Sequence, residues 1–195
     1  MIYRFNISKV EILNLYITTT VMQKLDFGCG QKKQSGYIGL DIFEGKDVDV
    51  VHDFNCFPYP FQDNVFDEIV CNSSLEHVDN FFRTVAELHR IAKPDAIIKI
   101  FCPHYSSADA YRDPTHKTFF AHTTFDIFAG GGSYISPYNG MLKIEKRSFG
   151  LPSNTGYIKT LFKKIFNSIP DLYEHHFCWI FPAQTIYYEL RVLKP

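Results

Sequence analysis

The stretch LDFGCG, residues 25–30, decides the fold of this chain. Its apolar residues stop at Gly28 and Gly30, which is typical of a buried strand that runs into a tight turn. Glycine lets the backbone of such a turn approach a neighbouring group closely, because glycine has no Cβ atom. We therefore expect a bound ligand beside this turn.

Length and charge limit the size of the domain and the kind of partner. The chain has 195 residues, which suits a single domain with one core. Charged residues make up 21% of the sequence and the formal net charge is -1. This balance gives no reason to expect nucleic acid as a partner, and it favours a small molecule.

The cysteines and the N-terminal region indicate the compartment. The five cysteines are an odd set without a close pair, and four of them lie in or beside apolar runs: Cys29, Cys56, Cys71, Cys102 and Cys178. We interpret them as reduced thiols of a cytoplasmic protein. No signal peptide and no apolar run of roughly 18 residues is present, so no membrane span is expected. Residues 1–21 are interpreted as a non-native or extra segment before Met22, an alternative start.

Short β-rich runs alternate with helical or loop segments, which predicts a mostly parallel sheet covered on both faces. The expected strands cover residues 23–27, 37–41, 48–52, 66–71, 96–102, 141–149 and 185–193.

Two helices and one long loop region are expected between these strands. Asp79 is predicted to cap a helix whose apolar positions run from Phe81 to Ala92, before Lys93-Pro94 ends it. The apolar positions within residues 158–166 predict a second helix, packed on the sheet. Residues 103–140 are interpreted as a substrate-facing insertion in a single domain.

The second predicted strand ends in YIGLD, so Asp41 lies at its carboxyl end. Ligands of open α/β sheets bind outside these strand ends, so Asp41 and the two glycines should share one crevice. An acid in this place can accept hydrogen bonds from a ribose diol, which indicates a nucleoside derivative. The dinucleotide pattern G-x-G-x-x-G has Lys33 at its last position, which disfavours NAD or FAD. Two further acids, Asp26 and Asp53, favour a cationic ligand, and S-adenosylmethionine carries a sulfonium, an ammonium and a ribose.

From Lys24 to Pro103 the chain resembles the class I S-adenosylmethionine-dependent methyltransferases, notably their small bacterial and archaeal branch. LDFGCG is similar to the first motif of this family, GLD to its second-strand acid, and HDFN with PYPFQDNVFDEIVCNSSLEHV to its third and fourth motifs. ELHRIAKPDAIIKIFCP is similar to the following helix and fifth strand. The resemblance implies a Rossmann-like three-layer sandwich with a seven-stranded, mostly parallel sheet whose last strand is antiparallel.

The resemblance also implies a set of cofactor contacts in chain order: Asp26, Gly28, Cys29, Gly30, Asp41, Ile42, Asp53, Phe54, Asn72 and Ser73. The acid and glycines of the first motif would line the methionine side, and Asp41 would bind the ribose hydroxyls. Asp53 and Phe54 would meet the adenine, and Asn72 with Ser73 would lie beside the reactive methyl group.

Two departures from the family pattern are visible. The usual helix after the first motif is nearly absent, because the second strand arrives about seven residues after Gly30. This departure leaves part of one sheet face to be covered by another segment, for which residues 1–21 and the helix near Ile158 are the candidates. The family's KPGG turn is replaced by Lys93-Pro94-Asp95-Ala96.

The substrate side is expected in the segment that begins after the fourth strand and in PHYSSADAYRDPTHKTFFAH, residues 103–122. Predicted substrate-binding residues are Glu76, His77, Tyr105 and His116. His104 follows the fifth strand directly and is the candidate general base, with an ordinary loop histidine as the alternative. The histidines and acids of residues 103–122 show no recurrent ligand spacing, so no metal site is predicted.

These patterns predict an enzyme that transfers a methyl group from S-adenosylmethionine to a small or medium acceptor and leaves S-adenosylhomocysteine. One alternative is an oxidoreductase that uses NAD or a nucleotide sugar on a similar sheet. Another is a protein that binds S-adenosylmethionine without catalysis. The acceptor and the oligomeric state are not predicted.

Overall fold

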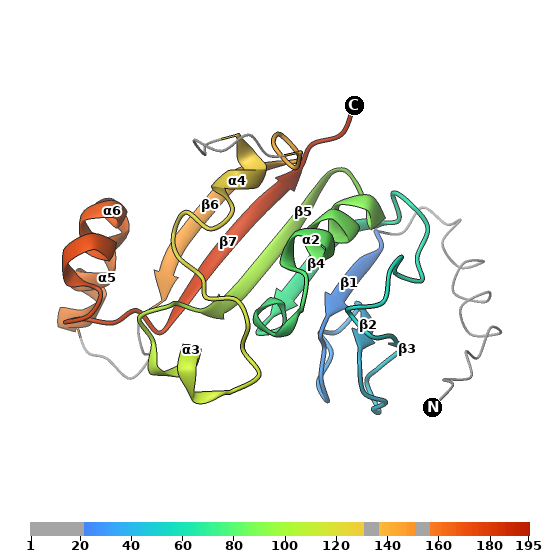
Figure 1. Ribbon diagram of the computed structural model, residues 1–195, viewed down its shortest axis with the longest axis horizontal. Helices are drawn as coiled ribbons and strands as arrows, with labels where there is room; N and C mark the ends of the chain where they lie inside the picture. Colours follow the sequence, from blue (N-terminus) through green and yellow to red (C-terminus); the bar gives the residue numbers. More distant parts are fainter. Residues whose placement is uncertain (1–21, 131–136, 151–156) are drawn as a thin grey trace.

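The computed structural model describes residues 22–130, 137–150 and 157–195, with side chains from Leu161 onward in the last range. Figure 1 shows one seven-stranded sheet in the order β3-β2-β1-β4-β5-β7-β6. The strands are β1 (Lys24–Phe27), β2 (Ile38–Asp41), β3 (Val50–Val51), β4 (Phe66–Asn72), β5 (Ala92–Pro103), β6 (Leu142–Gly150) and β7 (Thr185–Val192). Only β7 runs antiparallel to its neighbours β5 and β6. The predicted Rossmann-like α/β fold, with a mostly parallel sheet and an antiparallel last strand, is confirmed.

Seven helical segments complete the described chain. They are η1 (Leu75–His77), α2 (Phe81–Ile91), α3 (Ala108–Arg112), α4 (Asp126–Ala129), α5 (Tyr157–Ser168), α6 (Pro170–Leu172) and η2 (Tyr173–Phe177). None of the helices in the described ranges has the length and apolar character that a membrane span requires. Between β1 and β2 the described backbone forms turns rather than a helix, as the short spacing predicted.

The predicted helix after the fourth strand exists, but both of its ends differ from the prediction. Asn80 rather than Asp79 is the N-cap, since the Asn80 side chain accepts a hydrogen bond from the backbone N–H of Arg83. At the other end, Ala92 is already the first residue of β5. The family's glycine turn is replaced by Asp95, which adopts a left-handed backbone conformation with a φ of 63°.

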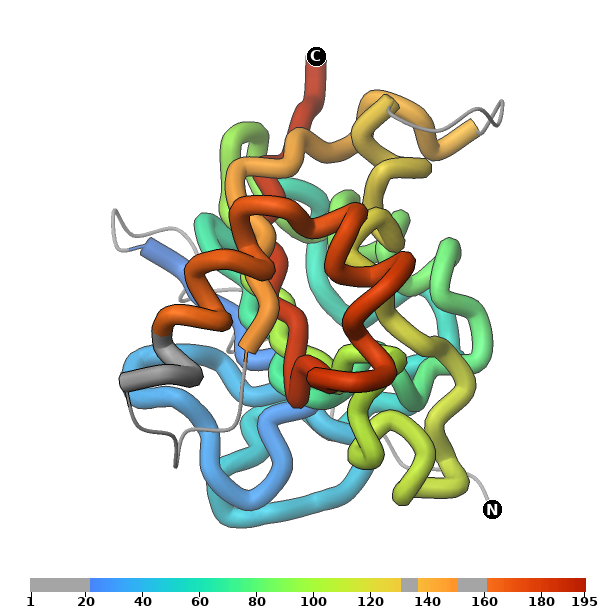
Figure 2. The backbone as a smooth tube through the Cα atoms, turned by 90° about the vertical axis from the view of Figure 1, so that its left-hand side faces the viewer, coloured from blue at the N-terminus to red at the C-terminus, as the bar shows by residue number. Residues whose placement is uncertain are grey.

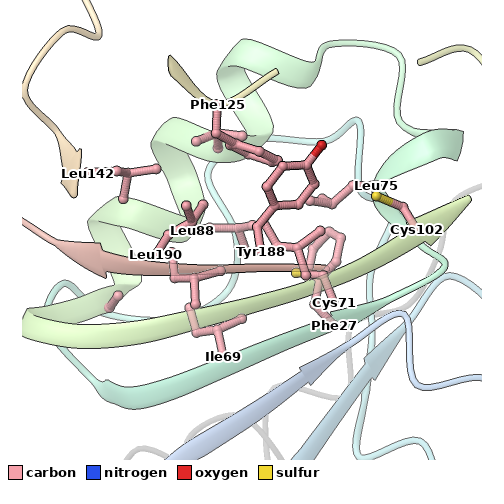
Figure 3. Close-up of a cluster of buried hydrophobic side chains, with 14 of the residues drawn as sticks. Phe27, Ile69, Cys71, Leu75, Leu88, Cys102, Phe125, Leu142, Tyr188 and Leu190 are labelled. Atoms are coloured by element: carbon pink, nitrogen blue, oxygen red, sulfur yellow. The ribbon is translucent and has the colours of Figure 1, made fainter. Parts of the chain in front are cut away.

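One face of the sheet carries the core. Alternate residues of the central strands point toward α2 and α4, and Figure 3 shows Ile69, Leu190 and Tyr188 of this face. Tyr188 packs edge-on against Phe125, with ring centroids 4.7 Å apart. Because these side chains are almost fully buried, their removal from water is the main term that stabilises the fold.

The opposite face is polar, and the described helices α2 and α4 do not lie on it. The Glu68 carboxylate lies 3.0 Å from the Lys99 ammonium and 3.9 Å from the Lys24 ammonium, and all three side chains are partly exposed. In the described part of the chain, α2 and α4 lie together on the other side of the sheet (Figure 2). A row of alternating charges on half-solvated strands needs no covering helix, because water solvates it.

The helix α5 lies at the β6 edge of the sheet and does not cover the polar face (Figure 1). The Asn167 side chain accepts a hydrogen bond from Phe149 N–H at 2.7 Å and donates one to Phe149 C=O at 3.3 Å. These bonds satisfy backbone groups of an edge strand that would otherwise be open to another strand. Of the predicted apolar face, Phe166 is buried whereas Leu161 and Ile165 are exposed, and the side chain of Ile158 lies outside the described part. Residues 1–21, the other candidate cover, also lie outside the described residues.

Candidate functional site

The turn after β1 is built by glycines in a backbone conformation that other residues avoid. Gly28 has a φ of +74° and Gly30 a φ of +58°. Gly28 N–H donates to the carbonyl oxygen of Leu40 at 2.8 Å, which fixes the turn to the end of β2. A Cβ atom on Gly28 would lie 2.4 Å from the Cβ of Ser74, so the turn and the segment after β4 are in direct contact.

Asp41 lies where the sequence predicted, beside the glycine turn. Its Oδ2 accepts the N–H of Gly30 at 2.8 Å, and its Oδ1 accepts the N–H of Phe43 at 3.1 Å. The carboxylate and the two glycines therefore share one crevice at the carboxyl ends of β1 and β2. Ile42, the next predicted contact, is exposed at the same edge.

Asp26 and Cys29 support this turn from inside the protein. Asp26 is almost fully buried, and its Oδ2 accepts the N–H of Gln34 at 2.8 Å. Burial raises the pKa of Asp26, although the Gln34 hydrogen bond and the Lys33 charge oppose the shift. Burial and the nearby Asp41 carboxylate raise the pKa of the Cys29 thiol to about 11, so this thiol stays protonated at neutral pH. All five cysteines are free, and four of them are buried, which agrees with the predicted reduced thiols.

The predicted adenine contacts are divided between core and surface. The Phe54 ring is 8% exposed and stacks on Phe27, with ring centroids 4.2 Å apart. The ring of Phe54 is thus a core aromatic. Asp53 is exposed, and its Oδ1 caps the following turn by accepting the N–H of Asn55 at 2.9 Å.

The segment after β4 leads into an open cavity of about 570 Å³. Asn72 and Ser73 are exposed here, and Ser73 has a left-handed φ of 51°. The cavity is lined by Ser73, Glu76, His77, Pro103, Asp109, Arg112, Asp113, Pro114 and His116. Glu76 C=O accepts the N–H of Lys117 at 2.7 Å, which ties η1 to the loop that follows α3.

Three of the four predicted substrate residues lie together at this cavity. Glu76 is 1% exposed, and neither of its carboxylate oxygens has a hydrogen-bond partner among the described residues. Burial raises the pKa of Glu76 and lowers the pKa of His77. The rings of His77 and His116 are in contact, with centroids 4.7 Å apart. The sequence predicted each residue separately, and only the fold brings them together.

The candidate base His104 lies elsewhere. Its side chain is fully buried, with Nε2 2.9 Å from Glu174 Oε1 and Nδ1 2.8 Å from Ser106 Oγ. Both ring nitrogens are therefore occupied, and His104 is not part of the cavity lining. Tyr105, the fourth predicted substrate residue, donates its hydroxyl hydrogen to Glu174 C=O at 3.2 Å and is likewise absent from the lining. This geometry favours a structural role for both residues.

Sequence reasoning missed Arg112 as part of the site. Arg112 lines the cavity and forms a 2.9 Å ion pair with Asp109, one turn earlier in α3. The only signal in the sequence was a basic residue among acids and histidines of residues 103–122. Such a signal does not distinguish a cavity residue from a solvated one.

The fold is shared with several solved structures. A crystal structure of an S-adenosylmethionine-dependent methyltransferase from Archaeoglobus fulgidus is 18% identical with a TM-score of 0.57, and the match covers 95% of this chain and 93% of that chain. One from Mesorhizobium loti is 15% identical with a TM-score of 0.54, covering 93% and 97%. The [4+2]-cyclase SpnF is 15% identical with a TM-score of 0.55, covering 95% and 81%. At these identities the likeness establishes the fold alone.

The sequence comparison adds a match to a family model over part of the chain. The model of the methyltransferase domain matches residues 42–100. This match lies within Lys24 to Pro103, the region where the sequence resembles the class I S-adenosylmethionine-dependent methyltransferases. No match was found among the curated proteins.

Proposed function

We propose that the crevice at Gly28, Gly30 and Asp41 binds S-adenosylmethionine and that the cavity beside Ser73 holds a small or medium methyl acceptor. The observation that carries this proposal is the 2.8 Å hydrogen bond between Asp41 Oδ2 and Gly30 N–H. The same turn contacts Ser74 through Gly28, so the cofactor side and the acceptor side of the site are adjacent.

The residues of the crevice fit the cofactor. A carboxylate offers about four lone-pair sites, and Asp41 uses two of them for backbone N–H groups, so two remain for a ribose diol. A Cβ atom built on Gly30 meets no described atom within 4 Å, which indicates open space beside the turn. When bound, S-adenosylmethionine supplies a methyl carbon on a positively charged sulfur, which a lone pair of the acceptor displaces.

The residues of the chain contribute mainly binding and orientation. Orienting the two reactants can lower the free-energy barrier by roughly 7 to 11 kcal/mol. An in-line displacement needs a general base only when the acceptor must lose a proton. Between β4 and η1, Ser73 lines the cavity and its neighbour Ser74 meets the glycine turn, so this short segment joins the two halves of the site. In this proposal His104 is a buried residue that forms hydrogen bonds with Ser106 and Glu174 and does not act as the base.

Calorimetry with two ligands separates this proposal from its alternatives. We expect the purified chain to bind S-adenosylmethionine and not NAD. Preferential binding of NAD would refute the methyl-donor assignment and favour an oxidoreductase. A chain that binds S-adenosylmethionine but forms no S-adenosylhomocysteine with any of a panel of hydroxyl, amine and thiol acceptors would be a binding protein. The panel is needed because the [4+2]-cyclase SpnF shares this fold, so the fold alone does not establish methyl transfer.

The variant Asp41→Asn tests the ribose contact. Asparagine keeps one oxygen for Gly30 N–H but loses the charge and acceptor capacity, so the dissociation constant of S-adenosylmethionine should rise roughly tenfold to 150-fold. Glu44→Gln, which removes a charge from an exposed side chain three residues away, is the matched control and should bind normally. Equal affinities in the two variants would remove the ribose assignment.

A cytoplasmic location, the absence of a nucleic-acid partner and a small-molecule acceptor are part of this proposal. The free cysteines, the net charge of -1 and the limited volume of the cavity support them.

A further inference from the structure

Three potential metal ligands converge at the inner wall of the cavity. Glu76, His77 and His116 each offer one ligand atom, and these atoms all lie within 4.8 Å of one another. This cluster was not predicted from the sequence, because two of its members lie after β4 and the third lies after α3. Loop contacts to the Glu76 carbonyl bring the two segments together.

The hydrogen bonds of the two histidines leave one nitrogen of each ring available as a ligand. His116 Nδ1 lies 2.9 Å from the carbonyl oxygen of Ala110, and a carbonyl can only accept, so His116 carries its proton on Nδ1. Thr115 Oγ1 donates to Asp113 Oδ1 at 2.7 Å and is therefore the acceptor for His77 Nδ1–H at 2.8 Å. In both rings the lone pair is left on Nε2. Histidines that bind metals show this arrangement, with the second ring nitrogen fixed by a carbonyl or other acceptor.

Glu76 supplies an independent indication of a ligand. Its side chain is 1% exposed, and both carboxylate oxygens lack a hydrogen-bond partner among the described residues. A buried carboxylate without a partner is costly, and buried charges in proteins are paired or coordinate metals. In the cavity lining, Asp109 and Asp113 add negative charge against the single positive charge of Arg112, which also favours a cation.

We propose that Glu76, His77 and His116 bind one divalent transition-metal ion, and that this ion holds an oxygen atom of the acceptor in the cavity. Two imidazole nitrogens and a carboxylate suit Zn²⁺ and similar ions, whereas Mg²⁺ and Ca²⁺ prefer oxygen ligands alone. Tetrahedral Zn²⁺ with bonds near 2.1 Å needs ligand atoms about 3.4 Å apart, so each pair of ligand atoms must close by about 1.4 Å at most. Three protein ligands leave a fourth position open for water or substrate. The acceptor would then carry a hydroxyl or carboxylate, and this second part rests on the proposed function.

Direct metal binding is the test. The tag-free full chain is stripped with a chelator and titrated with Zn²⁺ by calorimetry and with Co²⁺ by visible absorption. All proteins carry Cys56→Ser, because Cys56 is the one exposed thiol. We expect one ion per chain in this background and in the control His175→Ala, which removes an exposed histidine outside the cluster. Glu76→Gln and His116→Ala should weaken binding by at least about 100-fold, since changes of outer-shell partners alone cost 10- to 100-fold.

The outcomes distinguish this inference from the proposed function. A parent chain without stoichiometric Zn²⁺ or Co²⁺, or ligand variants that bind as tightly as the control, would overturn the metal site. Urea titration and circular dichroism establish that the variants fold, and the stoichiometry of the parent chain decides the question if they do not. Binding of S-adenosylmethionine to the metal-free chain is measured separately. If the chain binds S-adenosylmethionine but no metal ion, the metal inference alone is refuted. If the chain does not bind S-adenosylmethionine, the proposed function is refuted.

Discussion

The contact between Gly28 and Ser74 gives the sharpest prediction about the architecture of the site. In Gly28→Ala the new methyl group would lie 2.4 Å from Ser74 Cβ, whereas carbon atoms pack at about 3.5 to 4.0 Å. Ser74 is 4% exposed and immediately precedes η1, so it cannot move without moving the cavity wall. Overpacking of this kind costs about 1 to 3 kcal/mol.

The backbone adds a second cost. Gly28 has a φ of +74°, where an L-residue with a side chain loses about 1 to 2 kcal/mol. We therefore expect Gly28→Ala to lower the free energy of unfolding by roughly 2 to 5 kcal/mol. Gly30→Ala is the matched control, because it has a similar φ of +58° but no described atom within 4 Å of the new Cβ. It should lose only the backbone cost, about 1 to 2 kcal/mol.

Urea unfolding of the two variants measures the difference, and a third variant isolates the clash. Adding Ser74→Gly to Gly28→Ala removes the opposing Cβ atom, so the double variant should regain the overpacking cost of about 1 to 3 kcal/mol. Ser74→Gly alone supplies the reference value. Equal losses in Gly28→Ala and Gly30→Ala, or no recovery in the double variant, would show that the turn does not depend on this contact.

Two further predictions concern buried titratable groups. His104→Gln should lower the free energy of unfolding by about 1.5 to 3 kcal/mol, because the hydrogen bond between the buried imidazole and the partly buried Glu174 carboxylate is lost, and should leave S-adenosylmethionine affinity unchanged by calorimetry. Normal stability with abolished turnover would instead restore His104 as the base. Asp26→Asn keeps an oxygen for Gln34 N–H but removes a carboxyl whose pKa is raised by burial. Between the ordinary carboxyl pKa of 3.8 and the raised pKa of Asp26, the folded chain binds more protons than the unfolded chain, so wild-type stability should fall as pH rises through this window. Urea midpoints across acidic pH should show a smaller fall in the variant, and parallel curves would contradict the shift.

Local patterns were sufficient for much of this fold. Each of the seven strands lies within a few residues of its predicted place, because β-branched and apolar runs between turn residues are a local signal. The glycine turn and Asp41 were also predictable, since parallel strands bring their carboxyl ends to one edge of the sheet.

Helix caps and helix positions were less predictable. Asp79 and Asn80 are both good N-cap residues, and the sequence does not show which side chain reaches the free N–H groups. The amphipathic pattern of α5 was recognised. Its position at the edge of β6, however, depends on hydrogen bonds between Asn167 and Phe149, which lie 18 residues apart in the sequence. A periodic pattern says that a helix buries one side and does not say against which surface.

The local order of the sequence specified the sheet and the glycine turn beside Asp41, and it predicted the class of cofactor, since each depends on residues that are close along the chain. Tertiary packing alone decided which titratable side chains meet. It buried His104 against Glu174, 70 residues away, and it brought His116 to Glu76 and His77, from which α2, β5 and α3 separate it along the chain. The physical reason is that burial and proximity arise from contacts between distant segments, whereas strand and turn propensities arise from each segment alone.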